Sequence, residues 1–418
     1  MAGSGTRVGG AWMFIGQVVW AASQWAVIAV VARKTAPEAV GEFVLAMGIA
    51  TPTFLMAGLG LRVLAAADVR ATRPLKAYAL ARVGGAALAA AITLVGGLLA
   101  ANGTRAAAIV FAVVVLKLAD HAADLIYGGG LAVGRARSVG LSMVMRGAGG
   151  VVAAWATIAT TDSLAAGIVA MAGWWLVVLL AYDLRVWAAA ERGWQTTLAK
   201  QSREAVASLR VGLASVAKAG LPLGVVAGLG ALIVYVPAYF LDTVDPALTG
   251  IYGALNYGAL VLTLAGLAWG QAATPGMARL TDEPHRFARL LLGVNLGLVA
   301  LGALAAAAAL TISDPVVRIV YGETYAGQSV ALAWMMIGAT GYNVVTVSGY
   351  GALARGRFYL QPIPLVVGVA VEVALMAASH DGLTVESASV ALAIGAGVAA
   401  AAMTVLALWP SAAGVPQR

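Results

Sequence analysis

The sequence predicts an all-α integral membrane protein with twelve transmembrane helices in two six-helix lobes. Of its 418 residues, 61% are hydrophobic and 11% are charged, whereas soluble domains are about half apolar and a quarter charged. The apolar runs are about twenty residues long, the length that a helix needs to cross a bilayer. They lack the alternating segments of about ten residues that membrane β-strands show, so the sequence predicts a helical bundle rather than a barrel.

The predicted spans follow one another from near the N-terminus to near the C-terminus. The first span is longer than the roughly 7–15-residue core of a signal peptide, so we expect it to be retained. Breaks fall where charged and turn-forming residues cluster, as in "ARKTAPEA", "GRARS" and "DTVDPALTG". The twelve predicted spans are 10–32, 42–61, 83–100, 106–127, 139–160, 164–184, 220–241, 250–273, 290–312, 329–350, 359–379 and 388–409.

The basic residues predict the orientation of these spans. If the N-terminus lies in the cytoplasm, the only Lys and Arg residues of the outer loops are Arg33, Lys34, Arg105 and Arg318. All other basic residues outside the spans then lie on the inner side, as the positive-inside rule requires. We expect a multi-pass protein of the bacterial plasma (inner) membrane with both termini in the cytoplasm. This topology explains the net charge of +8 without nucleic-acid binding.

The chain is predicted to consist of two related halves. A long hydrophilic stretch near the middle divides an N-terminal lobe at 1–187 from a C-terminal lobe at 220–418, with a cytoplasmic linker at 188–219. Each lobe is expected to hold six spans with the same topology. Two lobes of this kind are typical of transporters, because they can rock about a central site.

Two short patterns that recur about half a chain apart support the duplication. Pro37, Gly41 and an aromatic residue follow the first span with the same spacing as Pro246, Gly250 and an aromatic residue after the seventh. Spans four and ten also end alike, with Tyr-Gly leading to Gly-Arg at 127–135 and again at 350–357. The shared patterns indicate duplicated halves, related by an axis along the membrane normal.

The fourth span carries a polar stripe in "LKLADHAADL". Lys117, Asp120, His121 and Asp124 have the spacing i, i+3, i+4 and i+7, which places them on one helix face. Because an intramembrane charge is costly, this face should be turned to the bundle interior, with Lys117 able to pair with Asp120. Two interpretations remain open. The charges either neutralise one another and fasten span four to span five through Arg146, or line a central cavity.

In the cavity interpretation, Lys117 and Arg146 bind an anionic group such as a diphosphate. Asp120 or Asp124 exchanges a proton or a sodium ion, and His121 titrates near neutral pH. No other cofactor or metal is expected.

Other polar side chains inside the spans form a second set of candidates. Glu372 stands alone in span eleven and is either a protonated structural residue or a further ion-coupling group. Gln17, Trp20 and Gln24 share one face of span one, and Asn256 lies in span eight. These residues can contact sugar hydroxyls in a wet cavity, or form hydrogen bonds between helices.

Four segments resemble the polysaccharide flippases of the MOP superfamily, the multidrug, oligosaccharidyl-lipid and polysaccharide exporters. They are "VVARKTAPEAVGEFVLAM" at 30–47, "LIYGGGLAVGRARSVGLSMVMRG" at 125–147, "GLPLGVVAGL" at 220–229 and "GIYGALNYGALVLTLAGLAWGQAATPGMARL" at 250–280. The resemblance implies alternating access of two lobes that move a polyprenyl-diphosphate-linked oligosaccharide. It also implies contact with membrane lipid and with other polysaccharide-assembly membrane proteins. We expect a monomer.

The sequence departs from this family at two places. Many relatives carry an acidic residue late in span two, where this chain has Gly58, and an Arg and an Asp in span seven, where it reads "LIVYVPAYF". A coupling site at those positions is therefore absent here.

Two alternative functions stay open. A cation-coupled multidrug or metabolite exporter has the same fold, although drug sites are more apolar and aromatic than the stripe of span four. A membrane glycan polymerase or ligase is a different class, but the chain has no Walker loop, HExxH or GxSxG motif. It also contains no cysteine, which excludes disulfides and thiolate chemistry. We therefore expect a transporter rather than an enzyme.

Overall fold

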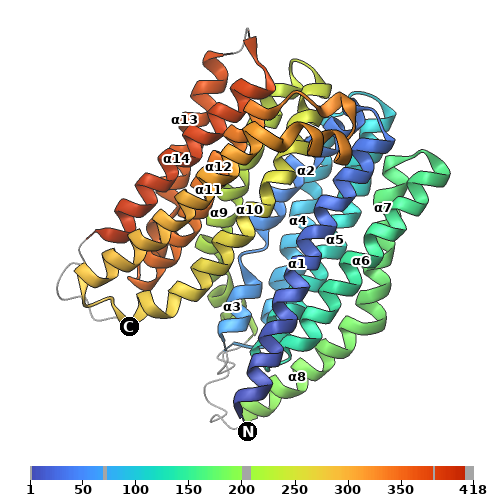
Figure 1. The fold of residues 1–418 in the computed structure, drawn as a ribbon. Helices are drawn as coiled ribbons and strands as arrows, with labels where there is room; N and C mark the ends of the chain where they lie inside the picture. Colours follow the sequence, from blue (N-terminus) through green and yellow to red (C-terminus); the bar gives the residue numbers. More distant parts are fainter. Residues whose placement is uncertain (1, 69–72, 200–208, 380–381, 410–418) are drawn as a thin grey trace. The chain divides into compact units, whose positions relative to one another are not determined.

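The computed structural model describes residues 2–68, 73–199, 209–379 and 382–409, and this part of the chain is helical almost throughout (Figure 1). Twelve helical segments within it are long and apolar enough to cross a membrane, which confirms the predicted fold class. The elements are α1 (Ala2–Lys34), α2 (Pro37–Ala57), α3 (Leu61–Ala67), α4 (Leu75–Ala100), α5 (Thr104–Ala132), α6 (Ala136–Thr161), α7 (Leu164–Val178), η1 (Leu179–Asp183), α8 (Leu184–Ala199), α9 (Leu209–Asp242), α10 (Pro246–Arg279), α11 (Pro284–Val320), η3 (Glu323–Tyr325), α12 (Ser329–Ala354), η4 (Phe358–Leu360), α13 (Pro362–Ala378) and α14 (Val385–Leu408).

Several helices extend well beyond the predicted spans. α9 and α10 have 34 residues each and α11 has 37, whereas the predicted spans are about twenty residues long. Apolar runs mark only the part of a helix that lies in hydrocarbon, and the backbone continues the helix into polar sequence on either side. The same effect places the start of α4 at Leu75 rather than at 83, so Arg82 lies within a helix. Residues 200–208 of the predicted linker lie outside the described residues.

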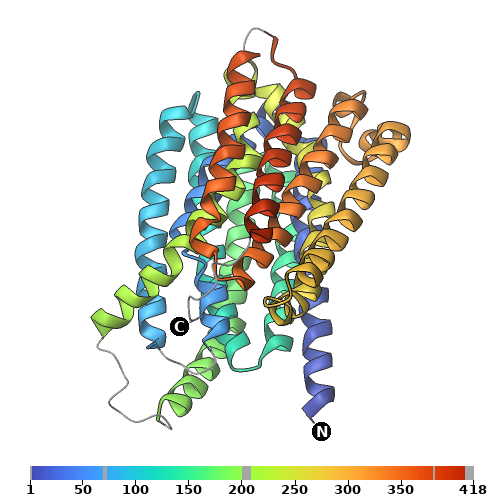
Figure 2. The same cartoon turned by 90° about the vertical axis from the view of Figure 1, so that its left-hand side faces the viewer.

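The chain divides into two compact units. The first unit contains Met1–Thr35 and Ile49–Gly228, and the second contains Ala36–Gly48 and Leu229–Arg418. In the first unit α5 is central and packs against α3, α4, α6, α7 and α8. In the second unit α12 packs against α10, α11 and α14, and α13 packs on α14, as the orange and red helices of Figure 2 show.

The predicted second span is interrupted inside the first unit. Leu59 and Gly60 both adopt left-handed backbone conformations, with φ of 53° and 55°, and separate α2 from α3. An α-helix of L-residues cannot continue through such a pair. Gly224 of α9 packs against this turn, where a Cβ atom would collide with the carbonyl oxygen of Met56. The glycine is therefore needed for the close approach of α9 to the turn.

The helices α5 and α12 end in the same way. Gly134 and Gly356 follow them in the left-handed region, with φ of 76° and 72°. The Arg135 N–H donates to the Gly130 carbonyl oxygen at 2.8 Å, and the Arg357 N–H donates to the Ala352 oxygen at 2.9 Å. Both ends are Schellman caps, which use the freedom of glycine to satisfy the last carbonyl groups. The Tyr-Gly to Gly-Arg pattern thus marks one local structure used twice.

Candidate functional site

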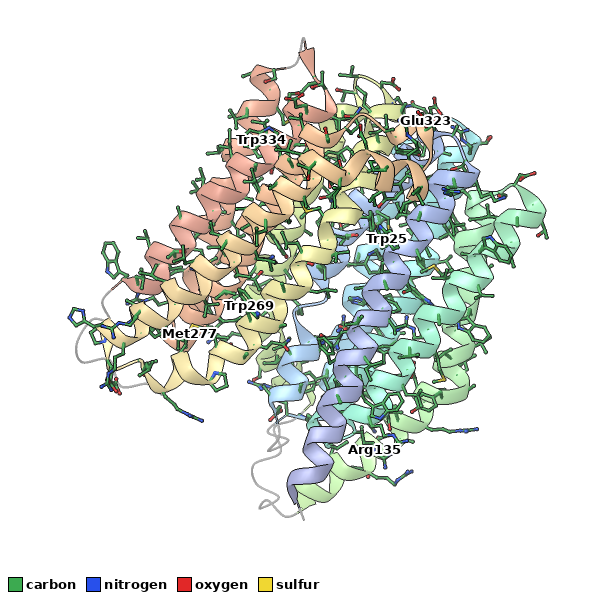
Figure 3. All side chains as sticks on the ribbon, viewed as in Figure 1. Trp25, Arg135, Trp269, Met277, Glu323 and Trp334 are labelled. Atoms are coloured by element: carbon green, nitrogen blue, oxygen red, sulfur yellow. The ribbon has the colours of Figure 1, made fainter. Side chains whose placement is uncertain are left out.

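The candidate site is a cluster of charged residues around α5, the central helix of the first unit. Trp25 and Arg135, labelled in Figure 3, mark α1 and the approach to α6 in this unit. The side chain of His121 is buried, and Lys117, Asp120 and Asp124 are half-buried. The arginine partners of the two aspartates come from neighbouring helices and not from α5 itself.

Asp124 is held by two arginines. Arg82 of α4 lies 2.7 Å from Oδ2 of Asp124, and Arg62 of α3 lies 3.4 Å from Oδ1. The Arg82 side chain is 6% exposed, and its Nη1 lies 3.1 Å from both ring nitrogens of His121. Both carboxylate oxygens of Asp124 are therefore occupied. The sequence analysis placed both arginines in inner loops, because each lies just outside the end of a predicted span.

Gly58 lies against the same cluster. A Cβ atom on Gly58 would be 3.0 Å from Cε1 of His121 and 3.1 Å from Nη1 of Arg82. Phe54 also contacts the imidazole in a T-shaped arrangement, with the two ring centroids 5.4 Å apart. A larger acidic side chain at position 58 would displace these groups, which gives a physical reason for the departure from the resembling family.

Arg146 of α6 binds to α5 by three contacts. Its Nη2 lies 3.5 Å from Oδ1 of Asp120 and donates to the carbonyl oxygen of Ala119 at 3.3 Å. Its Nη1 donates to the hydroxyl of Tyr127 at 3.2 Å. The Arg146 side chain is 1% exposed, whereas the side chain of Asp120 is 41% exposed. These contacts do fasten α6 to α5, which is the first of the two interpretations of the stripe.

Aromatic rings surround the Arg146 guanidinium. Its Cζ lies 4.7 Å from the ring centroid of Trp175 on α7, 5.2 Å from that of Trp20 and 5.9 Å from that of Tyr127. Trp20 and Trp175 also pack on each other, with centroids 4.8 Å apart. Cation–π attraction stabilises a charge that has little access to solvent. Trp20, a candidate for either sugar or interhelical contact, packs on Arg146 in this structure.

Asp183 is a third carboxylate in this region that sequence reasoning missed. It ends the π-helical turn η1 and is fully buried near Ser142 and Arg146, but neither of its carboxyl oxygens has a hydrogen-bond partner among the described residues. Ser142 also forms a 2.8 Å hydrogen bond with the Tyr127 hydroxyl. Asp183 falls at the end of the predicted sixth span, where the sequence does not separate a buried position from a loop.

The remaining predicted residues lie on α1 and in the second unit. Gln17 and Gln24 are half-buried on α1, and Nε2 of Gln24 has no hydrogen-bond partner among the described residues. Asn256 belongs to the second unit and lines a cavity of about 20 Å³ with Thr263 and Tyr342. That volume suffices for about one water molecule.

Glu372 also belongs to the second unit. It is fully buried on α13, next to Gly395 of α14. Neither carboxyl oxygen has a hydrogen-bond partner in the part of the chain that the structure describes. The structure therefore does not place Glu372 or Asn256 in the same compact unit as the α5 cluster.

The added arginines change the charge balance of the site. Arg62, Arg82, Lys117 and Arg146 face three carboxylates, those of Asp120, Asp124 and Asp183. Lys117 is the cation of this group that makes no ion pair within 4.0 Å among the described side chains. The sequence analysis assigned two cations and three carboxylates to the site: Lys117, Arg146, Asp120, Asp124 and Glu372. By formal charge, the observed cluster holds four cations against three carboxylates.

Comparison with known proteins identifies the fold. No protein-family model matches the chain, and no curated protein matches its sequence. Among solved structures, the MATE transporter VcmN of Vibrio cholerae is 16% identical, with 96% of this chain and 95% of that chain covered and a TM-score of 0.63. The lipid II flippase MurJ is 9% identical, with 95% and 86% covered and a TM-score of 0.67. The chain has the fold of the MOP superfamily transporters.

A third similar structure is a MOP superfamily transporter of Pyrococcus furiosus, at 16% identity with 95% of this chain and 93% of that chain covered and a TM-score of 0.63. The fold predicted from the four resembling segments is thus confirmed, while identities this low show the fold alone. The MOP fold is shared by drug exporters and a lipid flippase, so the choice between them depends on the residues of this chain.

Proposed function

We propose that this MOP-fold protein is a flippase. It moves a polyprenyl-diphosphate-linked oligosaccharide by alternating access from the cytoplasmic to the outer leaflet of the bacterial plasma membrane, with both termini in the cytoplasm. The observation that carries this proposal is the positive excess of the α5 cluster, with Lys117 outside every ion pair within 4.0 Å in the described residues. A diphosphate is the part of such a lipid that needs cations in a region of low dielectric.

The cluster divides into groups that bind and groups that support them. Lys117 and Arg62, both half-buried, are the direct contacts for the diphosphate. The side chains of Arg146 and Arg82 are 1% and 6% exposed, so they do not contact the diphosphate directly. They add positive electrostatic potential to the site and hold Asp120 and Asp124 in place. Asp120, Asp124 and His121 are the ion-coupling candidates of this unit.

The oligosaccharide needs polar and aromatic contacts of a different kind. Gln17, Trp20 and Gln24 supply these on α1, one to two turns apart, and Trp20 already contacts Arg146. In the second unit Asn256 is the sugar contact and Glu372 is the ion-coupling group. The name of MurJ, a lipid II flippase, supports a lipid-linked substrate for this fold. Other polysaccharide-assembly membrane proteins are partners in this proposal, and the chain acts as a monomer.

A cation-coupled multidrug or metabolite exporter is the second candidate. It is favoured by the likeness to the MATE transporter VcmN and by the Trp20–Trp175 pair, since aromatic surfaces bind organic cations. In this chain the guanidinium of Arg146 already occupies the cationic position against both rings. The exporter therefore ranks below the flippase.

Native mass spectrometry of the protein in mild detergent tests the proposal. A polyprenyl diphosphate and the matching monophosphate are offered in turn to the wild-type protein, Lys117→Ala and Lys117→Arg. The wild type should retain the diphosphate, Lys117→Ala should weaken its binding about tenfold, and Lys117→Arg should preserve much of it, because one charge-assisted hydrogen bond contributes about 1.5–3 kcal/mol.

Lys218→Ala is the matched control, because Lys218 is exposed on α9 in the same unit. It should bind the diphosphate as the wild type does. Equal retention of the diphosphate and the monophosphate, or equal binding by wild type and Lys117→Ala, would contradict the assignment of the cluster. Displacement of bound lipid by organic cations would favour the exporter instead.

A further inference from the structure

Two helices of this chain belong to both compact units. Residues 37–48 of α2 lie in the second unit and 49–57 in the first, while residues 209–228 of α9 lie in the first unit and 229–242 in the second. Alternating access requires the two units to move, and a helix shared between moving units has to bend where the chain passes from one to the other. The boundary inside α2 is therefore a place where transport needs a hinge.

The sequence of α2 interrupts its backbone hydrogen bonds at this boundary. Pro52 lies inside the helix, four residues after Gly48. Because proline has no amide N–H, the carbonyl oxygen of Gly48 loses the donor that the fourth following residue supplies in an α-helix. The proline ring also crowds that carbonyl group, which is why helices kink at such positions. The stretch from Gly48 to Pro52 is thus predisposed to bend.

Side-chain hydroxyls donate to the two carbonyl groups at this interruption. The hydroxyl of Tyr239, on α9, donates to the carbonyl oxygen of Gly48. Within α2, Oγ1 of Thr53 donates to the carbonyl oxygen of Ile49 at 2.7 Å, a type of bond that often accompanies a bend in a helix. Tyr239 and Gly48 both belong to the second unit. Tyr239 therefore supplies the hydrogen bond that Pro52 cannot make.

The glycine at position 48 allows two tyrosine rings to reach the backbone of α2. A Cβ atom on Gly48 would lie 3.1 Å from Cε1 of Tyr239 and 3.2 Å from Cδ1 of Tyr235, which is closer than ordinary van der Waals contact. Both tyrosines belong to "LIVYVPAYF", the part of span seven where many members of the resembling family carry an Arg and an Asp. In this chain the same stretch contacts the α2 backbone through a hydroxyl group.

We propose that residues 48–52 form a hinge in α2, and that Tyr239 is a positioning residue whose hydroxyl holds this hinge in the conformation of the structure. When α2 changes its bend, the carbonyl oxygen of Gly48 leaves the hydroxyl, and the hydrogen bond forms again when α2 returns. No covalent step is involved. This inference rests on the proposed function, because a hinge in α2 is needed only by a protein whose two units move.

A single neutral hydrogen bond has a suitable strength for this role. The net contribution of such a bond changes an equilibrium about two- to tenfold. That is enough to favour one conformation of α2 over another, and small enough for the hinge to leave it in every transport cycle. A side chain is also easier to displace than a backbone amide, since it can rotate away while α9 keeps its own helical hydrogen bonds.

Hydrogen–deuterium exchange of the full-length protein in lipid nanodiscs, read by mass spectrometry of α2 peptides, tests this inference. Tyr239→Phe keeps the ring and removes the donor, so the amides that follow Gly48 should exchange about two- to tenfold faster. Pro52→Ala restores an amide N–H four residues after Gly48 and should slow this exchange about tenfold. In the Pro52→Ala background Tyr239→Phe should have no effect, because the carbonyl oxygen of Gly48 then has a backbone donor.

Tyr342→Phe is the matched control, because it removes a tyrosine hydroxyl that lines the small cavity of the same unit. It should leave the exchange of α2 unchanged. An unchanged exchange rate in Tyr239→Phe, or the same acceleration with and without Pro52→Ala, would overturn the inference, since a role in packing alone does not depend on Pro52.

The hinge can fail separately from the proposed function. No lipid-linked substrate is present during the exchange measurement, so its result does not depend on diphosphate binding. Pro52→Ala should retain the polyprenyl diphosphate in native mass spectrometry as the wild type does, but should move the labelled glycan lipid across proteoliposome membranes about tenfold more slowly. Translocation by Pro52→Ala at the wild-type rate would overturn the hinge and leave the flippase proposal standing.

Discussion

Gly41 and Gly250 lie reciprocally against the first turns of each other's helices. A Cβ atom on Gly41 would collide with the carbonyl oxygen of Pro246, and a Cβ atom on Gly250 would collide with that of Pro37. Both positions lie in the second unit, which includes the first turns of α2. The repeated Pro-x-x-x-Gly pattern thus forms one symmetrical contact, in which each copy supplies the glycine that the other copy needs.

Alanine at either glycine should destabilise the protein to a similar degree. We expect Gly41→Ala and Gly250→Ala each to lower the free energy of unfolding by about 1–3 kcal/mol, because backbone atoms cannot move aside as a flexible side chain can. Thermal unfolding in detergent measures the effect. Gly293→Ala on α11 is the control, since nothing lies within 4 Å of a Cβ atom there. Equal unfolding temperatures for all three variants would show that the contact is loose.

The two Schellman caps give a second matched pair. Gly134→Ala and Gly356→Ala should each cost about 1–2 kcal/mol, because L-residues avoid the left-handed conformation that both glycines adopt. Asn tolerates this conformation better, so the corresponding Asn variants should lose less stability. If only one of the two Ala variants were destabilised, the caps would not be equivalent in the folded protein.

The membrane-spanning helices were predictable because each has a long run of apolar residues. Apolar runs of about twenty residues indicated all twelve spans, whereas the recurrence of Pro37 and Gly41 at Pro246 and Gly250 indicated duplication but not the contact that these glycines make. The ends of helices were less predictable. The break at Leu59 depends on backbone conformation and on the fit of α9, and neither leaves a signal in hydropathy.

The site was predictable only in part, for a related reason. The i, i+3, i+4, i+7 spacing identified the stripe of α5, since it depends on a single helix. Its partners Arg62 and Arg82 come from other helices near the ends of the apolar runs, where a buried charge cannot be told from a loop charge. The pairing of Lys117 with Asp120 was expected from spacing alone, but Asp120 forms its close ion pair with Arg146 instead.

The Arg82–Asp124 pair should show unequal single-mutant effects. Asp124→Ala leaves Arg82 buried without its carboxylate and should cost about 3–5 kcal/mol. Arg82→Ala leaves Asp124 partly exposed and still near Arg62, so we expect about 1–2 kcal/mol. The double variant should be less destabilised than the sum of the two.

The exposed pair of Arg286 and Glu283 serves as the control for this cycle. Its closest atoms are 2.8 Å apart, but both side chains are solvated. Its coupling should therefore stay below about 1 kcal/mol. A coupling of similar size in both pairs would mean that Arg82 is more hydrated than the structure indicates.

Replacing the buried carboxyl of Glu372 should increase the stability of the protein and impair its function. We expect Glu372→Met to raise the free energy of unfolding by about 1–2 kcal/mol, because it removes a buried carboxyl that has no hydrogen bond among the described residues. If Glu372 is an ion-coupling group, the same variant should lose the pH dependence of transport while keeping lipid binding at the α5 cluster. A destabilised Glu372→Met would indicate that the carboxyl has a structural partner.

The most direct test of the account is translocation in proteoliposomes of defined lipid composition. A labelled polyprenyl-diphosphate glycan is placed in one leaflet, and a membrane-impermeant lectin reports its arrival on the other side. The account predicts protein-dependent translocation by wild type and by Lys218→Ala, and a rate about tenfold lower for Lys117→Ala at equal amounts of folded protein. Translocation no faster than in protein-free vesicles, or an undiminished rate in Lys117→Ala, would contradict it.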